Sequence, residues 1–81
     1  MAGITKIGDY AFYNHEELMS IDIPDSVKSI GKEAFWACSG LAQVSIGNGV
    51  TSIGDGAFAG CDGFVSIDIP DSVKNMGAYA F

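Results

Sequence analysis

One histidine and two cysteines are the residues that most invite a chemical interpretation. His15, Cys38 and Cys61 follow one another at a constant spacing of 23 residues, and imidazole and thiolate groups are common zinc ligands. Zinc sites, however, usually draw pairs of ligands from short local spacings such as CxxC. We therefore expect no metal site, and interpret these residues as an inward-facing row. Free thiols are favoured over the alternative, a Cys38–Cys61 disulfide, which requires neighbouring coils to approach to about 6 Å.

Catalytic and cofactor motifs are equally weak. The glycine pairs at 47–49 and 54–56 lack the third glycine of a dinucleotide fingerprint, and neither a GxxxxGK sequence nor the acidic spacing of an EF-hand occurs. The histidine has only the sequential Glu16 and Glu17 beside it, which is not the arrangement of a base with an orienting third group. The sequence predicts no catalytic residue, no cofactor and no enzyme.

Length and composition limit the possible partners. Eighty-one residues leave room for one domain, 1–81, and a hydrophobic fraction of 48% argues against a disordered chain. Ten acidic residues against four basic ones give a net charge of -6, so no nucleic-acid partner is expected. No run of 18 apolar residues is present, which predicts no membrane span, and the first twenty residues show no signal peptide.

The elements that must position these side chains are internal repeats. The chain divides into repeats at 4–26, 27–49 and 50–72 and a partial repeat at 73–81, and such periodicity indicates a stacked array of one structural unit. Apolar residues recur at fixed places in every repeat, with a phenylalanine always after an alanine. We expect these columns to form the core, with the phenylalanines Phe12, Phe35, Phe58 and Phe81 wedged between the layers.

Within each repeat the pattern predicts one strand and one turn region. The runs 19–23 and 65–69 alternate apolar and polar residues, as a strand with one buried face does. Gly8 and its counterparts precede a turn, which indicates either positive φ or a close backbone approach. Segments such as 32–38 are too short for a stable free helix, so we expect one helical turn there.

The pattern (V/I)xxIGxxAFxxCxxLxxIxIP, repeated from residue 4 onward, resembles the BspA-type, or Treponema pallidum-type, leucine-rich repeats. The resemblance implies an α/β fold: a right-handed solenoid with a short parallel β-sheet on the concave face and extended segments or single helical turns on the convex side. It also implies a surface or secreted protein that binds other proteins, as bacterial and protozoan adhesins do. His15 and Gly47 depart from the family pattern, which has Cys or Asn and Pro there.

Two surfaces are candidates for recognition of a protein partner whose identity the sequence does not give. The first is the outward strip of the concave sheet, where small polar and acidic residues gather: Ser20, Asp22, Gln43, Ser45, Ser66 and Asp68. The second is a convex aromatic patch, Tyr13 and Trp36, because exposed aromatic residues are frequent interaction hot spots. The alternatives are a solvated scaffold for the strip and a shield over the backbone for the patch.

A second hypothesis is self-association, whether the chain is a natural fragment or an engineered unit. The sequence shows no polar cap at either end of the array, and an unprotected strand edge can template pairing. We therefore expect a homodimer through the solenoid ends, closed by a two-fold axis rather than head-to-tail. The expected edge residues are Met19, Ile21, Ile23, Val65, Ile67, Ile69, Met76 and Phe81.

Overall fold

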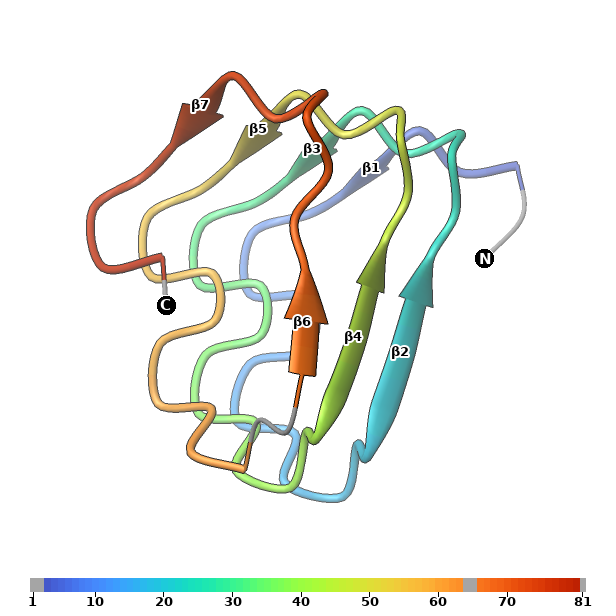
Figure 1. The fold of residues 1–81 in the computed structure, drawn as a ribbon. Coiled ribbons are helices and arrows are strands. Elements are labelled where there is room, and N and C mark those ends of the chain that lie inside the picture. Colours follow the sequence, from blue (N-terminus) through green and yellow to red (C-terminus); the bar gives the residue numbers. More distant parts are fainter. Residues whose placement is uncertain (1–2, 64–65, 81) are drawn as a thin grey trace.

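The computed structural model describes residues 3–63 and 66–80 of the chain, which coil into three full layers and the beginning of a fourth (Figure 1). Seven short strands account for the regular structure of these residues. Their bounds are β1 Lys6–Ile7, β2 Ser20–Ile23, β3 Ser29–Ile30, β4 Gln43–Ile46, β5 Ser52–Ile53, β6 Ser66–Asp68 and β7 Asn75–Met76.

The strands form two parallel sheets on different sides of the coil. β2, β4 and β6 make a three-stranded sheet, and β1, β3, β5 and β7 make a four-stranded sheet (Figure 1). Neighbouring strands in each sheet come from successive repeats, so that Asp22 lies opposite Ser45 and Ile30 opposite Ile53. The predicted solenoid with a parallel sheet is confirmed, and the four-stranded sheet is an addition that the sequence pattern did not indicate.

The third side of each coil consists of reverse turns. In the second repeat, Ala34 donates its N–H to the Gly31 carbonyl and Cys38 donates to the Phe35 carbonyl, at 3.3 and 3.4 Å. The prediction of a helical turn at 32–38 is wrong, because no helix occurs within residues 3–63 and 66–80. The chain leaves the helical path because Glu33 and Ala37 have φ of 51° and 57°, in the left-handed region that a right-handed helix excludes.

Glycine is needed before the turns because the layers approach closely there. A Cβ on Gly54 would lie 2.6 Å from the Lys32 nitrogen and 2.7 Å from the Gly31 carbonyl carbon, both backbone atoms of the preceding layer. Gly31 meets the backbone of Asp9 in the same way. Of the two explanations that the sequence left open, the structure supports close approach, since none of these glycines has positive φ.

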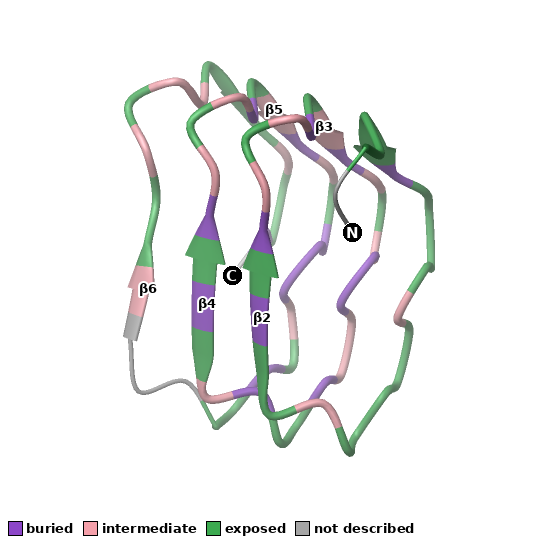
Figure 2. Ribbon diagram, turned by 90° about the vertical axis from the view of Figure 1, so that its right-hand side faces the viewer, coloured by how far each residue is buried: buried purple, intermediate pink, exposed green. Residues whose placement is uncertain are grey.

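The core lies between the two sheets and the turns, and phenylalanine rings run through it. Phe35 is fully buried and stacks on Phe12 and on Phe58 with ring centroids 5.1 and 5.0 Å apart. Cys38 and Cys61 are buried behind these rings, as the sequence predicts. The prediction of an inward-facing row is wrong for His15, which is exposed because the described residues place no layer over it. In Figure 2 the buried segments concentrate in the middle layers, and Phe12 in the first layer is only half-buried. Stacking on both sides is therefore what completes the burial of each layer.

The left-handed backbone at Ala37 gives a test of the turn geometry. The equivalent residue of the third repeat is Gly60, at φ 76°, and glycine adopts this region without the steric cost that a Cβ brings. Ala37→Gly is expected to raise the free energy of unfolding by about 0.5–1 kcal/mol, measured by urea denaturation. Ala59→Gly, whose parent residue lacks positive φ, is the control and should lower it by about 0.5–1 kcal/mol. Equal effects of the two substitutions would contradict the turn assignment.

Candidate functional site

The residues predicted as a concave strip come together on the outer face of the three-stranded sheet. Strand register places Asp22 opposite Ser45, and Ser45 opposite Asp68, while Gln43 pairs with Ser20. β2 and β4 alternate exposed and buried residues, so these polar side chains face outward and the isoleucines and valine face the core. A shallow hollow of about 310 Å³ runs over the strip. For Ser66 the structure describes the pairing with Gln43 but not the side chain.

The predicted edge residues divide into two groups. Met19, Ile69 and Met76 are 73%, 42% and 45% exposed, so their side chains are accessible at the ends of the array. Ile21 and Ile23 lie on edge strand β2 but are buried in the core, which leaves only their backbone available for pairing. Of the remaining three, Ile67 is partly buried, and Val65 and Phe81 lie outside the described residues.

The two residues of the predicted convex patch do stack. The rings of Tyr13 and Trp36 are nearly parallel, with centroids 6.4 Å apart and an interplanar angle of 11°. Tyr10 meets the Tyr13 ring edge-on at 5.7 Å. The patch is thus continuous over the first two layers, and Trp36 forms its border toward the third.

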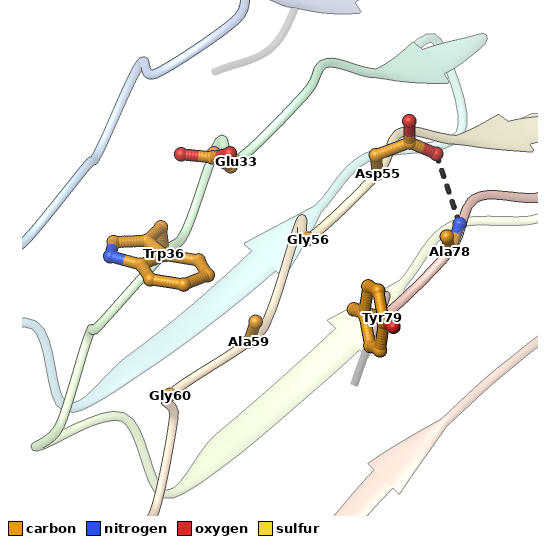
Figure 3. Close-up of a pocket in the computed structure, with 8 residues that line it drawn as sticks. All are labelled: Glu33, Trp36, Asp55, Gly56, Ala59, Gly60, Ala78 and Tyr79. Carbon is orange, nitrogen blue, oxygen red and sulfur yellow. Dashed lines mark hydrogen bonds between the residues drawn. The ribbon is translucent and has the colours of Figure 1, made fainter.

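Beyond Trp36 the aromatic column is interrupted, and a hollow of about 490 Å³ opens. Its floor includes Gly56 and Ala59, and Figure 3 shows Ala59 between the rings of Trp36 and Tyr79. Glu33 and Asp55 also border the hollow. The sequence pattern did not predict this site, although it contains a signal: the third repeat has small residues in columns that hold aromatic residues in other repeats.

The cysteines that suggested a metal site are instead part of the core. Each thiol donates a hydrogen bond to a backbone carbonyl of the preceding layer: Cys38 Sγ to Phe12 O at 3.2 Å and Cys61 Sγ to Phe35 O at 3.0 Å. Both are free thiols. Burial raises the pKa of Cys61 to about 11 and also raises the pKa of Cys38. A thiol held protonated in this way is a weak nucleophile and a poor metal ligand.

The raised pKa of Cys61 predicts a loss of stability at alkaline pH. Because the folded protein holds this proton more tightly than the unfolded chain, the contribution is complete below the ordinary pKa of 9.0 and is lost as pH rises through about 11. Cys61→Ser keeps a donor for the Phe35 carbonyl but does not titrate in this range. We expect the free energy of unfolding to fall less between about pH 8 and about pH 11 in Cys61→Ser than in the parent chain. Parallel pH profiles from urea denaturation would show that Cys61 is not the group responsible.

Within residues 3–63 and 66–80, no three side chains of His, Cys, Asp or Glu gather closely enough to hold a metal ion. In the same part of the chain no helix has the length and hydrophobicity needed to cross a bilayer.

Comparison with known protein families identifies the type of repeat. The family model described as "BspA type Leucine rich repeat region (6 copies)" matches residues 3–81. A search of curated protein sequences gives no significant match.

Three solved structures share the fold. The leucine-rich-repeat protein of Treponema pallidum is 30% identical with a TM-score of 0.89 over 95% of this chain. A leucine-rich-repeat protein from Bacteroides capillosus is 40% identical with a TM-score of 0.85 over 90%. A leucine-rich cell surface protein from Faecalibacterium prausnitzii is 39% identical with a TM-score of 0.82 over 93%.

The present chain spans only 37%, 52% and 21% of the length of these three chains, respectively. Leucine-rich repeats are generally modules for protein interaction and are typically non-enzymatic. The repeat pattern, the stacked layers and the family match all identify the same kind of repeat. The chain belongs to the BspA-type leucine-rich-repeat family.

Proposed function

We propose that this chain is a protein-binding module of a cell-surface or secreted adhesin, and that the strip on the three-stranded sheet contacts the protein partner. The observation that carries the proposal is the strand register, which aligns Asp22, Ser45 and Asp68 in one row across three layers. The cell-surface description of the similar Faecalibacterium prausnitzii chain supports the location.

The chemistry of the strip indicates what it would recognise. Its exposed side chains are short or polar, so a partner can approach the sheet closely, and two carboxylates flank the hydroxyl of Ser45. Basic and hydroxyl groups of a partner complement such a surface. The parallel sheet holds the row rigidly, which limits the conformational entropy lost on binding.

Purified extracellular-matrix proteins provide a direct test. Collagen, laminin and fibronectin are immobilised separately, and binding of the 81-residue chain is measured by surface plasmon resonance. We expect saturable, salt-sensitive binding to at least one of them, weakened about tenfold or more by Asp22→Asn combined with Asp68→Asn, because charge complementarity across the interface is lost.

The matched control is Asp62→Asn combined with Asp71→Asn, which removes the same charge from two exposed residues outside the strip. This variant should bind like the parent chain. Binding to none of the three proteins, or equal loss in both double variants, would refute the proposed function.

We also propose that the 81-residue chain forms a homodimer through its ends. Support comes from the fourth layer, where Met76 is 45% exposed while Ile30 and Ile53, its counterparts in the inner layers, are 2% exposed. Ile69 is likewise exposed beside the edge strand β6. Apolar surface of this kind favours burial against a second copy.

Light scattering at increasing protein concentration tests the dimer. The expected mass is that of two chains, returning to 8.4 kDa in Met76→Lys combined with Ile69→Lys. The control is Thr51→Lys, because Thr51 is exposed on an inner layer. This variant should leave the dimer intact. A monomeric mass of the parent chain at high micromolar concentration would exclude dimerisation through the ends.

A further inference from the structure

The hollow beside Trp36 is formed by a break in two side-chain columns. One column contains Tyr13 and Trp36 in the first two layers and Ala59 in the third, and the other changes from Glu33 to Gly56. The missing side chains leave a recess in the third layer. Its edge lies at Gly56, where the Glu33 Cγ and the Trp36 Cε3 are 3.1 and 3.6 Å from the position that a Cβ would occupy. The recess thus has an aromatic wall that is already fixed by stacking on Tyr13.

The fourth layer provides the opposite wall. Tyr79 is 86% exposed, and Figure 3 places its ring on the far side of Ala59 from Trp36. The hydrogen bond from the Ala78 N–H to Asp55 Oδ1, at 2.9 Å, fixes the carboxylate beside this wall (Figure 3). Two aromatic rings therefore flank a floor without bulky side chains.

Within residues 3–63 and 66–80, no ion pair neutralises the negative charge at the rim. Glu33 and Asp55 both border the recess, and none of the four lysines, all of which lie in the described part of the chain, forms an ion pair with either carboxylate. Aromatic faces attract cations through their quadrupole, and unpaired carboxylates attract them through charge. The volume of about 490 Å³ also falls within the range of ligand pockets.

We propose that this recess binds the cationic side chain, lysine or arginine, of a partner polypeptide. The alkyl stem would lie over Ala59, between the two rings, and the charged head would reach Glu33 or Asp55. This site is on the turn side of the coil, separate from the strip on the three-stranded sheet, so it does not depend on the function proposed above.

Short capped peptides that differ only in charge test the proposal. Acetyl-Gly-Lys-Gly-amide and acetyl-Gly-Arg-Gly-amide are compared with the neutral analogues that carry norleucine and citrulline. Binding is followed by the amide NMR shifts of Gly56 and Gly60 and by the fluorescence of Trp36, the chain's one tryptophan. We expect saturable shifts with at least one cationic peptide over the millimolar range, weakened by added salt, and an affinity about tenfold lower for its neutral analogue.

Three variants change the recess without touching the core. Tyr79→Gly removes one wall, Ala59→Tyr fills the floor with the ring type of the first repeat, and Glu33→Gln removes a charge. Each should weaken binding of the cationic peptide about threefold or more. Because Tyr79 has φ of 58°, Tyr79→Gly is expected to be at least as stable as the parent chain, so a loss of binding there cannot come from unfolding.

Tyr10→Gly is the matched control, since Tyr10 occupies the same column and also has positive φ, 61°. It should gain stability in the same way and bind the cationic peptide like the parent chain. Equal affinity for neutral and cationic peptides, no saturable shift with either cationic peptide, or equal binding by Tyr79→Gly and the parent chain would overturn the proposal. None of these outcomes bears on the sheet strip, because its variants are on another face.

Discussion

Phe35→Ala is expected to lower the free energy of unfolding by about 4 kcal/mol or more, a large part of what a domain of this size has. Phe35 is fully buried and stacks on two other rings. The substitution removes the side chain's burial, leaves a cavity that the neighbouring layers cannot fill, and breaks both aromatic pairs, each of which adds about 0.5–1.5 kcal/mol. Urea denaturation followed by circular dichroism measures the change.

The control for this prediction is Phe12→Ala in the first layer. Phe12 is half-buried, and Phe35 is its stacking partner in the core column, so its loss should cost about 2 kcal/mol. If Phe35→Ala does not fold, Phe35→Leu keeps most of the volume and should cost less than about 2 kcal/mol. Equal costs for Phe12→Ala and Phe35→Ala would mean that the rings do not form a continuous stack.

Gly54→Ala is expected to destabilise the protein by about 3 kcal/mol or more, although only one methyl group is added. The new Cβ would meet three backbone atoms of the preceding layer, at 2.6 to 2.9 Å. Backbone cannot move aside as a side chain can, so β3 and β5 must separate, and the hydrogen bond from Gly54 N–H to Ile30 O, now 2.8 Å, must lengthen. Thermal unfolding measures the effect.

Gly8→Ala is a control at the same position of the first repeat. A Cβ on Gly8 meets no atom within 4 Å, because the described chain places no layer before it. Its effect should lie within about 0.5 kcal/mol of zero. Similar losses in both variants would assign the need for glycine to local backbone conformation and not to stacking.

The core and the three-stranded sheet could be predicted because each depends on a pattern that recurs in every repeat. The alternation in β2 and β4 gave their buried faces, and the repeat length gave their register. Cys38 and Cys61 could be placed inside because they share a column with no partner for metal binding nearby in sequence. These inferences needed only the period and the chemistry of each side chain.

The four-stranded sheet and the turns could not be predicted in the same way. β3 and β5 contain two residues each, too few to show an alternation. Positive φ at Glu33 and Ala37 is unusual for these residue types, so their identity gave no indication of it. Only the third repeat indicates positive φ at these positions, since it has Gly56 and Gly60 in the columns of Glu33 and Ala37.

The candidate sites show the same division. The alignment of the strip follows from strand register, which the repeat length predicts, whereas the recess depends on which way side chains leave the turns. Trp36 and Tyr79 belong to different columns of the repeat, and only the reverse turns place them on opposite sides of Ala59. The sequence shows that the aromatic column ends at Ala59, but it does not show that Tyr79 forms the opposite wall of the recess.

Nuclear Overhauser contacts between neighbouring strands test most directly whether the layers stack in register. The structure predicts backbone contacts of the parallel type between Ser29 and Ser52 and between Val44 and Ile67, together with ring contacts between Phe35 and Phe58. Contacts of the antiparallel type joining β2 to β3 as a hairpin, with no contact between the phenylalanine rings, would contradict the solenoid.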